Sequence, residues 1–386
     1  MDRLTRRGFL GGVAGMAASA SVAGATSAAS TARGSGAVDP SKTEPILIDF
    51  LGSPGPFNQL DQGNGEALSD ERIANVRASG LSAINVTILG GTFEKMCADI
   101  AFWEHEIGSH PDVFVRVRTV DDVRQAHATG RLGLIYGFQG VGGLGDELEP
   151  FDVFARLGVR VMQLTYNGRD LVGDGCLEPG NAGLSRFGLE VLEHLNHQRV
   201  LVDLGHCGQQ TTADAIAHSK VPVAISHSGC RVLADLPRNK RDEELRAMAE
   251  RGGVVGIYLM PFLAAGRQVT GDDVVLHLEH ALEVCGEDHV GIGSDLSITP
   301  LPDTEEFRKQ HREFVEMRQK YHVAAPGESP DRFYNVPDFN HPRRLQMVGE
   351  RLRARGHSTK RIEKILGGNW LRLLDEVWGA PAVAVG

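Results

Sequence analysis

Short apolar segments rich in β-branched residues alternate with amphipathic segments along most of the chain, and this alternation limits the fold more than any other feature. Eight segments have the length and composition of buried strands: 46–50, 82–87, 132–138, 160–166, 200–206, 221–227, 254–260 and 290–295. A ninth, weaker candidate covers 113–118. Helical patterns separate them, for example at 69–79, 184–197, 211–219, 242–251 and 272–285. Repeated strand–helix–strand units predict a parallel sheet.

Eight strands in about 250 residues is the size of a closed (β/α)8 barrel. An open, doubly wound sheet is the alternative. Its nucleotide-binding form has no support, because no GxGxxG motif follows the first strand and no P-loop pattern occurs. We therefore predict an α/β fold with a single (β/α)8 TIM-type barrel over 46–380. Extra C-terminal helices are expected over 343–378.

One charged, proline-containing segment, 301–342, interrupts the alternation and has a helical centre at 305–320. It is either a lid or partner contact, or a solvated surface excursion.

The first thirty residues have the features of an export signal. Arg6 and Arg7 form a twin-arginine pair, and a Gly/Ala-rich apolar run follows as far as Ala25. Small residues at 23–25 or 28–29 would suit cleavage. We expect a Tat-type signal peptide at 1–30, a flexible linker at 31–45, and a periplasmic or secreted protein.

The charge balance bears on the partners. The chain has 40 Lys and Arg against 50 Asp and Glu, a net charge of -10, without a basic block. This argues against nucleic acid and anionic membranes as partners. After the signal, no stretch approaches the ~18 apolar residues of a spanning helix, so no stable membrane insertion is expected. We expect a small-molecule substrate and leave a homodimer open.

Three of the predicted strands end at a polar residue. Residues 200–206 (VLVDLGH) end at His206, 221–227 (VPVAISH) end at His227, and 290–295 (VGIGSD) end at Asp295. In a barrel, the carboxyl ends of the strands carry the catalytic groups. Two imidazoles and a carboxylate suit a Zn²⁺-type cation, and Asp295 could also act as general base for a metal-bound water. The alternative is three unrelated polar residues at strand–loop junctions.

Other polar residues are less informative. Arg238 lies on the loop after the second His strand, where it either clamps a substrate carboxylate or faces solvent. The residues that follow, 240–243 (KRDE), are expected to be solvated. His277 and His280 share a helix face and are also expected to face solvent.

Taken in order, these motifs resemble the renal or membrane dipeptidases, zinc peptidases of family M19 on an amidohydrolase-like barrel. The resemblance runs from 46 to 378. It depends on LVDLGH (201–206), PVAISHS (222–228), PRN (237–239) and VGIGSD (290–295), with support from GLSRFG (183–188) and GGNWLR (367–372).

The resemblance implies hydrolysis of dipeptides or small amides at a two-zinc site. His206 and His227 match ligands of one zinc. Asp295 matches the carboxylate that binds the other zinc and handles the proton. Arg238 matches the arginine that holds the substrate carboxylate.

The chain departs from the family pattern at four positions. Leu51 and Ser53 stand where the family has a metal-binding His and Asp, Gln139 replaces the bridging Glu, and Tyr166 replaces a His near the reacting carbonyl. These departures predict one Zn²⁺ ion at most, held by His206 and His227 with Asp295 or Gln139. A metal-free site stays open. Tyr166 could donate a hydrogen bond to a developing oxyanion, and Gln139 could contact substrate.

Cys207 and Cys230 lie close to the two histidines in sequence. Each is either a replacement metal ligand or a small buried residue. Three functions follow from the site as a whole: a single-metal hydrolase, a catalytically inactive binding protein, and a metal-independent enzyme.

Overall fold

The computed structural model describes residues 44–58, 66–88 and 91–379. The predicted signal peptide and most of the predicted linker lie outside these residues. All nine predicted strand segments contain a strand. The strands are β1 (Ile48–Ser53), β2 (Ala83–Ile88), β3 (Phe114–Arg116), β4 (Leu132–Phe138), β5 (Val159–Gln163), β6 (Leu201–Asp203), β7 (Ala224–Ser228), β8 (Val254–Ile257), β9 (Val290–Ile292) and β10 (Leu296–Ser297).

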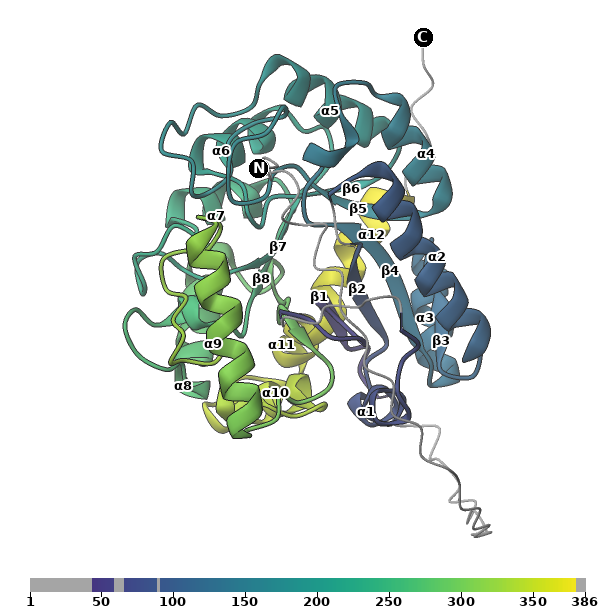
Figure 1. The fold of residues 1–386 in the computed structure, drawn as a ribbon, viewed down its shortest axis with the longest axis vertical. Coiled ribbons are helices and arrows are strands. Elements are labelled where there is room, and N and C mark those ends of the chain that lie inside the picture. Colours follow the sequence, from purple (N-terminus) through teal and green to yellow (C-terminus); the bar gives the residue numbers. More distant parts are fainter. Residues whose placement is uncertain (1–43, 59–65, 89–90, 380–386) are drawn as a thin grey trace, which may run out of the picture.

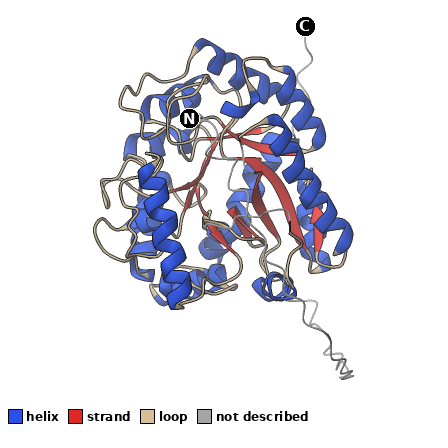
Figure 2. Ribbon diagram, in the orientation of Figure 1, coloured by secondary structure: helices blue, strands red, loops and turns tan. Residues whose placement is uncertain are grey.

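Helices follow most strands and surround them (Figures 1 and 2). They are α1 (Asp70–Ser79), α2 (Phe93–Ser109), α3 (Val120–Thr129), α4 (Glu149–Leu157), α5 (Arg186–His197), α6 (Gln209–His218), α7 (Asp242–Glu250), α8 (Gly271–Cys285), α9 (Glu305–Lys320), α10 (Arg344–Ala354), α11 (Thr359–Glu363) and α12 (Asn369–Gly379). The predicted helix at 305–320 is confirmed as α9.

The strands form one parallel sheet in the order β10-β1-β2-β4-β5-β6-β7-β8-β9, and β3 pairs with β4 in addition. Three residues, 293–295, separate β9 from β10. Because β9 pairs with β8 and β10 pairs with β1, the last strand is an interrupted strand that completes the ring. The predicted (β/α)8 architecture is confirmed.

A buried carboxylate joins the two ends of this ring. Asp49 of β1 accepts hydrogen bonds from the backbone N–H of Ser294 (2.7 Å) and from its hydroxyl (2.6 Å). Burial raises the pKa of Asp49 to about 6. The first and last strands are therefore held together beside Asp295.

The apolar residues divide between two layers. Alternate strand residues point into the barrel, among them Ile48, Phe50, Ile135 and Val161, and they pack with α12. Trp370 of α12 stacks on Phe50, with ring centroids 3.9 Å apart, and donates its indole N–H to the Ile292 carbonyl (3.1 Å). The C-terminal helix, yellow in Figure 1, thus packs against the inward-facing residues of the barrel strands.

Within the described residues, no helix is long and apolar enough to cross a membrane.

We predict that Trp370→Ala destabilises the fold by about 3–5 kcal/mol, because it leaves a cavity under Phe50 and removes the hydrogen bond to Ile292. Urea unfolding followed by circular dichroism measures this. Leu276→Ala is the control, since Leu276 is 47% exposed and its truncation should cost less than about 0.5 kcal/mol. Equal losses for the two variants would contradict the assigned role of α12.

Candidate active site

The predicted site residues gather at the carboxyl ends of β5, β6 and β7 and in the break between β9 and β10. The His206 ring stacks on the Tyr166 ring, with centroids 4.1 Å apart, and lies 4.9 Å from the ring of His227. The structure thus brings together the two predicted histidines and the predicted tyrosine.

His227 is held by a hydrogen-bonded chain. The Ser226 hydroxyl donates to Asp203, and its oxygen lies 2.7 Å from Nδ1 of His227. Because the serine proton is already committed to the carboxylate, Nδ1 of His227 must be the donor. Nε2 of His227 then carries a lone pair, and it is buried without a hydrogen-bond partner among the described residues.

His206 is also held through Nδ1, which lies 2.7 Å from Oδ1 of Asn167. Burial lowers the pKa of both His206 and His227 well below the ordinary value, and the positive charge of Arg238 lowers both further. Both imidazoles are therefore neutral at physiological pH.

Asp295 lies at the break in the last strand. Its backbone has a positive φ of 61°, which is uncommon for a residue other than glycine. The backbone N–H donates to Leu51 (2.8 Å), and the backbone carbonyl accepts from the Asn58 side chain (2.8 Å). Burial raises the pKa of the carboxyl to about 7, although the charges of Arg238 and Arg318 oppose the shift. Asp295 can therefore exchange a proton near neutral pH.

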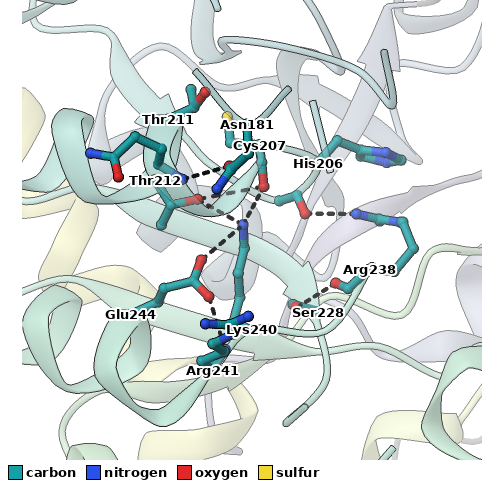
Figure 3. A network of polar contacts seen from close by, with 12 residues as sticks. Asn181, His206, Cys207, Thr211, Thr212, Ser228, Arg238, Lys240, Arg241 and Glu244 are labelled. Carbon is teal, nitrogen blue, oxygen red and sulfur yellow. Dashed lines mark hydrogen bonds and ion pairs between the residues drawn. The ribbon is translucent and has the colours of Figure 1, made fainter. Parts of the chain in front are cut away.

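Arg238 is 2% exposed, so the surface interpretation of this residue is wrong. Its Nη1 donates to the Gly205 carbonyl (2.7 Å), next to His206 (Figure 3). Its Nη2 is buried and has no hydrogen-bond partner among the described residues. An unpaired buried guanidinium donor is costly. This free edge is suited to a carboxylate ligand.

The expectation that 240–243 is solvated is wrong for Lys240, which is 3% exposed. Its ammonium group donates to the Cys207 carbonyl (2.7 Å) and the Thr212 hydroxyl (2.8 Å) (Figure 3). Glu244, one helical turn further on, lies 3.8 Å away. The buried ammonium group of Lys240 thus holds the loop that follows His206 in place.

The remaining predicted residues have structural contacts. Gln139 accepts a hydrogen bond from Gln163 through its backbone oxygen. Leu51 is buried, and the Ser53 hydroxyl accepts from the backbone of Gly55 (3.0 Å). His277 is buried rather than solvent-facing, with Nδ1 accepting from the Cys230 backbone (2.9 Å).

The thiols of Cys207 and Cys230 are buried, and burial raises the pKa of Cys207 to about 11. The Cys207 sulfur accepts a hydrogen bond from the Thr165 hydroxyl, and the Cys230 thiol donates to the His277 carbonyl, both at 3.4 Å, so each is packed as a small buried residue.

The segment 301–342 contributes to the site through Arg318 of α9. Arg318 lies close enough to Tyr166 and His206 to affect their pKa values. It also makes two hydrogen bonds to Glu328, at 2.8 and 2.9 Å. Sequence reasoning did not find Arg318 or Asn167. Arg318 has no motif around it, whereas Asn167 directly follows Tyr166 and could have been noticed.

The donor set limits what metal the site can hold. The described residues contain no group of three or more His, Cys, Asp or Glu side chains arranged to hold a metal ion. His206, His227 and Asp295 therefore do not form the predicted three-ligand set here. Leu51, Ser53 and Gln139, the positions that the resemblance assigns to metal ligands, carry neither a carboxylate nor an imidazole. Two neutral imidazoles suit one ion at most.

A cavity of about 200 Å³ adjoins the site. Its polar lining includes Cys176, Glu178, Asn181, Gln209 and Lys240. The thiol of Cys176 donates to Oδ1 of Asn167 (3.5 Å), the same atom that contacts His206. The cavity therefore reaches to within two side chains of His206.

The chain resembles known proteins over most of its length. The family model for membrane dipeptidase (peptidase family M19) matches residues 91–324. The solved structure of an amidohydrolase from Pseudomonas aeruginosa is 31% identical, with a TM-score of 0.75, and the match covers 87% of this chain and 97% of that one.

Curated relatives include dipeptidase verJ from Clonostachys rogersoniana, 32% identical over 49% of this chain and 51% of verJ. The chain thus spans about half of that relative's length. A protein from the pqqA 5′ region of Klebsiella pneumoniae is 27% identical over 67% of this chain and 86% of its own. From the match of the family model and the shared barrel, the chain belongs to the membrane dipeptidase family, peptidase family M19.

Proposed function

We propose that the protein hydrolyses a dipeptide or a similar small amide that carries a free carboxylate. The observation that carries the proposal is Arg238, a fully buried guanidinium with one unpartnered edge beside Asp295, Tyr166 and the two histidines. Membership of a family of peptidases supports the class of reaction.

Each side chain has a role that follows from its chemistry. Arg238 holds the substrate carboxylate. Asp295 accepts a proton from the attacking water and returns it to the leaving amine, because its pKa of about 7 allows both states. The Tyr166 hydroxyl donates a hydrogen bond to the oxyanion that develops on the attacked carbonyl.

One metal ion is part of this proposal. His206 and His227 would hold it, and the ion would supply Lewis-acid activation of water. Support comes from the neutral state of both rings and from the unpartnered Nε2 of His227.

The absence of a third ligand in the described part of the chain favours a second candidate, a metal-independent enzyme that uses Asp295, Tyr166 and Arg238. A catalytically inactive binding protein with the same pocket is the third. We further propose export through the twin-arginine signal at Arg6 and Arg7.

We predict that Arg238→Met lowers kcat/KM for a dipeptide about 10- to 150-fold, mainly through KM, because a charged hydrogen bond to the substrate carboxylate is lost. Steady-state kinetics with a dipeptide and its C-terminal amide measure this. The amide lacks the carboxylate, so its poor turnover should change little. Arg238→Lys is the conservative control and should retain part of the activity. Equal losses on both substrates would contradict carboxylate binding.

We predict that kcat/KM rises with pH through a midpoint near 7. Burial raises the pKa of Asp295, so the carboxyl is protonated below this pH and cannot accept a proton. Asp295→Asn should abolish the activity at every pH, while Asn still tolerates the positive φ. Asp170 is the matched control, a half-buried carboxyl with a pKa of about 6 that accepts a hydrogen bond from the Val172 backbone. If the midpoint of the kcat/KM profile shifts in Asp170→Asn, the group that titrates is not Asp295.

We predict one equivalent of metal per chain, by elemental analysis of protein purified without chelators or a His tag. His206→Ala and His227→Ala should each lose it. His280→Ala should not, because His280 pairs with Asp242 outside the site. Two equivalents would contradict the single-ion proposal. No metal after incubation with Zn²⁺, with turnover intact, would leave the metal-independent enzyme.

A further inference from the structure

The side chain of Asn167 links His206 to the segment that follows α9. We propose that Asn167 is a positioning residue that fixes the tautomer of His206, with the Val323 carbonyl holding the amide in place. The inference deepens the proposed function and rests on it only for the catalytic consequence. It also means that the 301–342 segment, through Val323, helps to position a residue of the candidate active site.

The orientation of the Asn167 amide follows from its partners. Its Nδ2 lies 3.2 Å from the carbonyl oxygen of Val323. A backbone carbonyl only accepts hydrogen bonds, so the NH₂ group of Asn167 must face it. The Oδ1 atom then faces Nδ1 of His206 at 2.7 Å and the thiol of Cys176 at 3.5 Å. Both of these groups can donate.

The consequence for His206 is a fixed tautomer. Since Oδ1 of Asn167 can only accept, the proton of the neutral imidazole lies on Nδ1, and Nε2 carries the lone pair. Free histidine in water prefers the opposite tautomer, with the proton on Nε2. His227 reaches the same Nδ1–H state through Ser226 and Asp203. Two different hydrogen-bonding arrangements therefore give both rings the same tautomer. In this tautomer Nε2 is free to bind a metal or to accept a proton.

Val323 is itself held firmly. Its N–H donates to the Arg318 carbonyl (3.0 Å), and its carbonyl also accepts from Nη2 of Arg318 (3.3 Å). Glu328 fixes the Arg318 guanidinium with two hydrogen bonds and accepts from the Ala325 N–H (2.8 Å). This buried ion pair braces the loop after α9, so the position of Val323 is set by the loop and not by Asn167.

The test is the tautomer of His206, read from the ¹⁵N chemical shifts of its ring nitrogens in the full chain, treated with chelator, above pH 7.5. His206→Gln assigns the signals. We expect a protonated Nδ1 in the native protein. A protonated Nε2 there would overturn the proposal outright.

Two variants separate positioning from general support of the fold. Asn167→Leu keeps the branched shape of the side chain but has no acceptor, so His206 should shift toward the Nε2–H form. Asn167→Asp keeps an acceptor facing His206, loses the donor to Val323 and adds a negative charge that also favours a proton on Nδ1, so His206 should keep its Nδ1–H. A purely structural role predicts equal behaviour for the two. An unchanged tautomer in Asn167→Leu, or a lost Nδ1–H form in Asn167→Asp, would refute the inference.

Asn340→Leu is the matched control. Asn340 also bonds through both amide atoms, to the backbone of Leu301, and lies in the 301–342 segment that contains Val323. It should leave the His206 signals in place. A shift of the His206 signals in this variant equal to that in Asn167→Leu would mean that the whole segment, and not Asn167, determines the His206 tautomer.

Where the protein turns over a dipeptide, Asn167→Leu should lower kcat about 10- to 100-fold, the usual effect of losing a group that orients a histidine, with little change in KM. Turnover unchanged in a variant with a reversed tautomer would refute the catalytic consequence. If no dipeptide is hydrolysed by the native protein, the proposed function fails, while the tautomer measurement still decides the role of Asn167.

Discussion

A hydrogen-bonded carboxylate, that of Asp49, closes the barrel, and the geometry of the site depends on it. It joins β1 to Ser294, in the gap between the two halves of the last strand. Asp295 follows directly, with its N–H on Leu51 and a positive φ. The position of the Asp295 carboxyl is therefore set at the join between the first and last strands.

The electrostatics of the pocket differ from those of a site built around two cations. Arg238, Arg318 and Lys240 lie around His206, while the positions that would carry anionic ligands hold Leu51, Ser53 and Gln139. Fewer anions beside several fixed cations weaken the attraction for a divalent ion and strengthen it for a carboxylate. The buried cations thus support the proposed binding of an organic anion beside His206.

The fold and half of the site could be predicted from the sequence because both depend on local patterns. The strands are apolar runs of regular length, and the groups that end them (His206, His227 and Asp295) point to one end of a barrel. Contacts over long sequence separations carry no such pattern. The burial of Lys240 depends on the loop after His206, and the bond between Asn167 and Val323 spans 156 residues. Arg318 was missed because an arginine on a charged helix has no distinguishing context.

The packing of Trp370 on Phe50 has a consequence for how the chain is made. Phe50 is synthesised long before Trp370, because 320 residues separate the two positions in the chain. Until α12 emerges, the apolar interior of the barrel stays uncovered. Packing of the barrel interior must therefore wait for α12, and a nascent chain that lacks this helix presents that interior to chaperones and proteases.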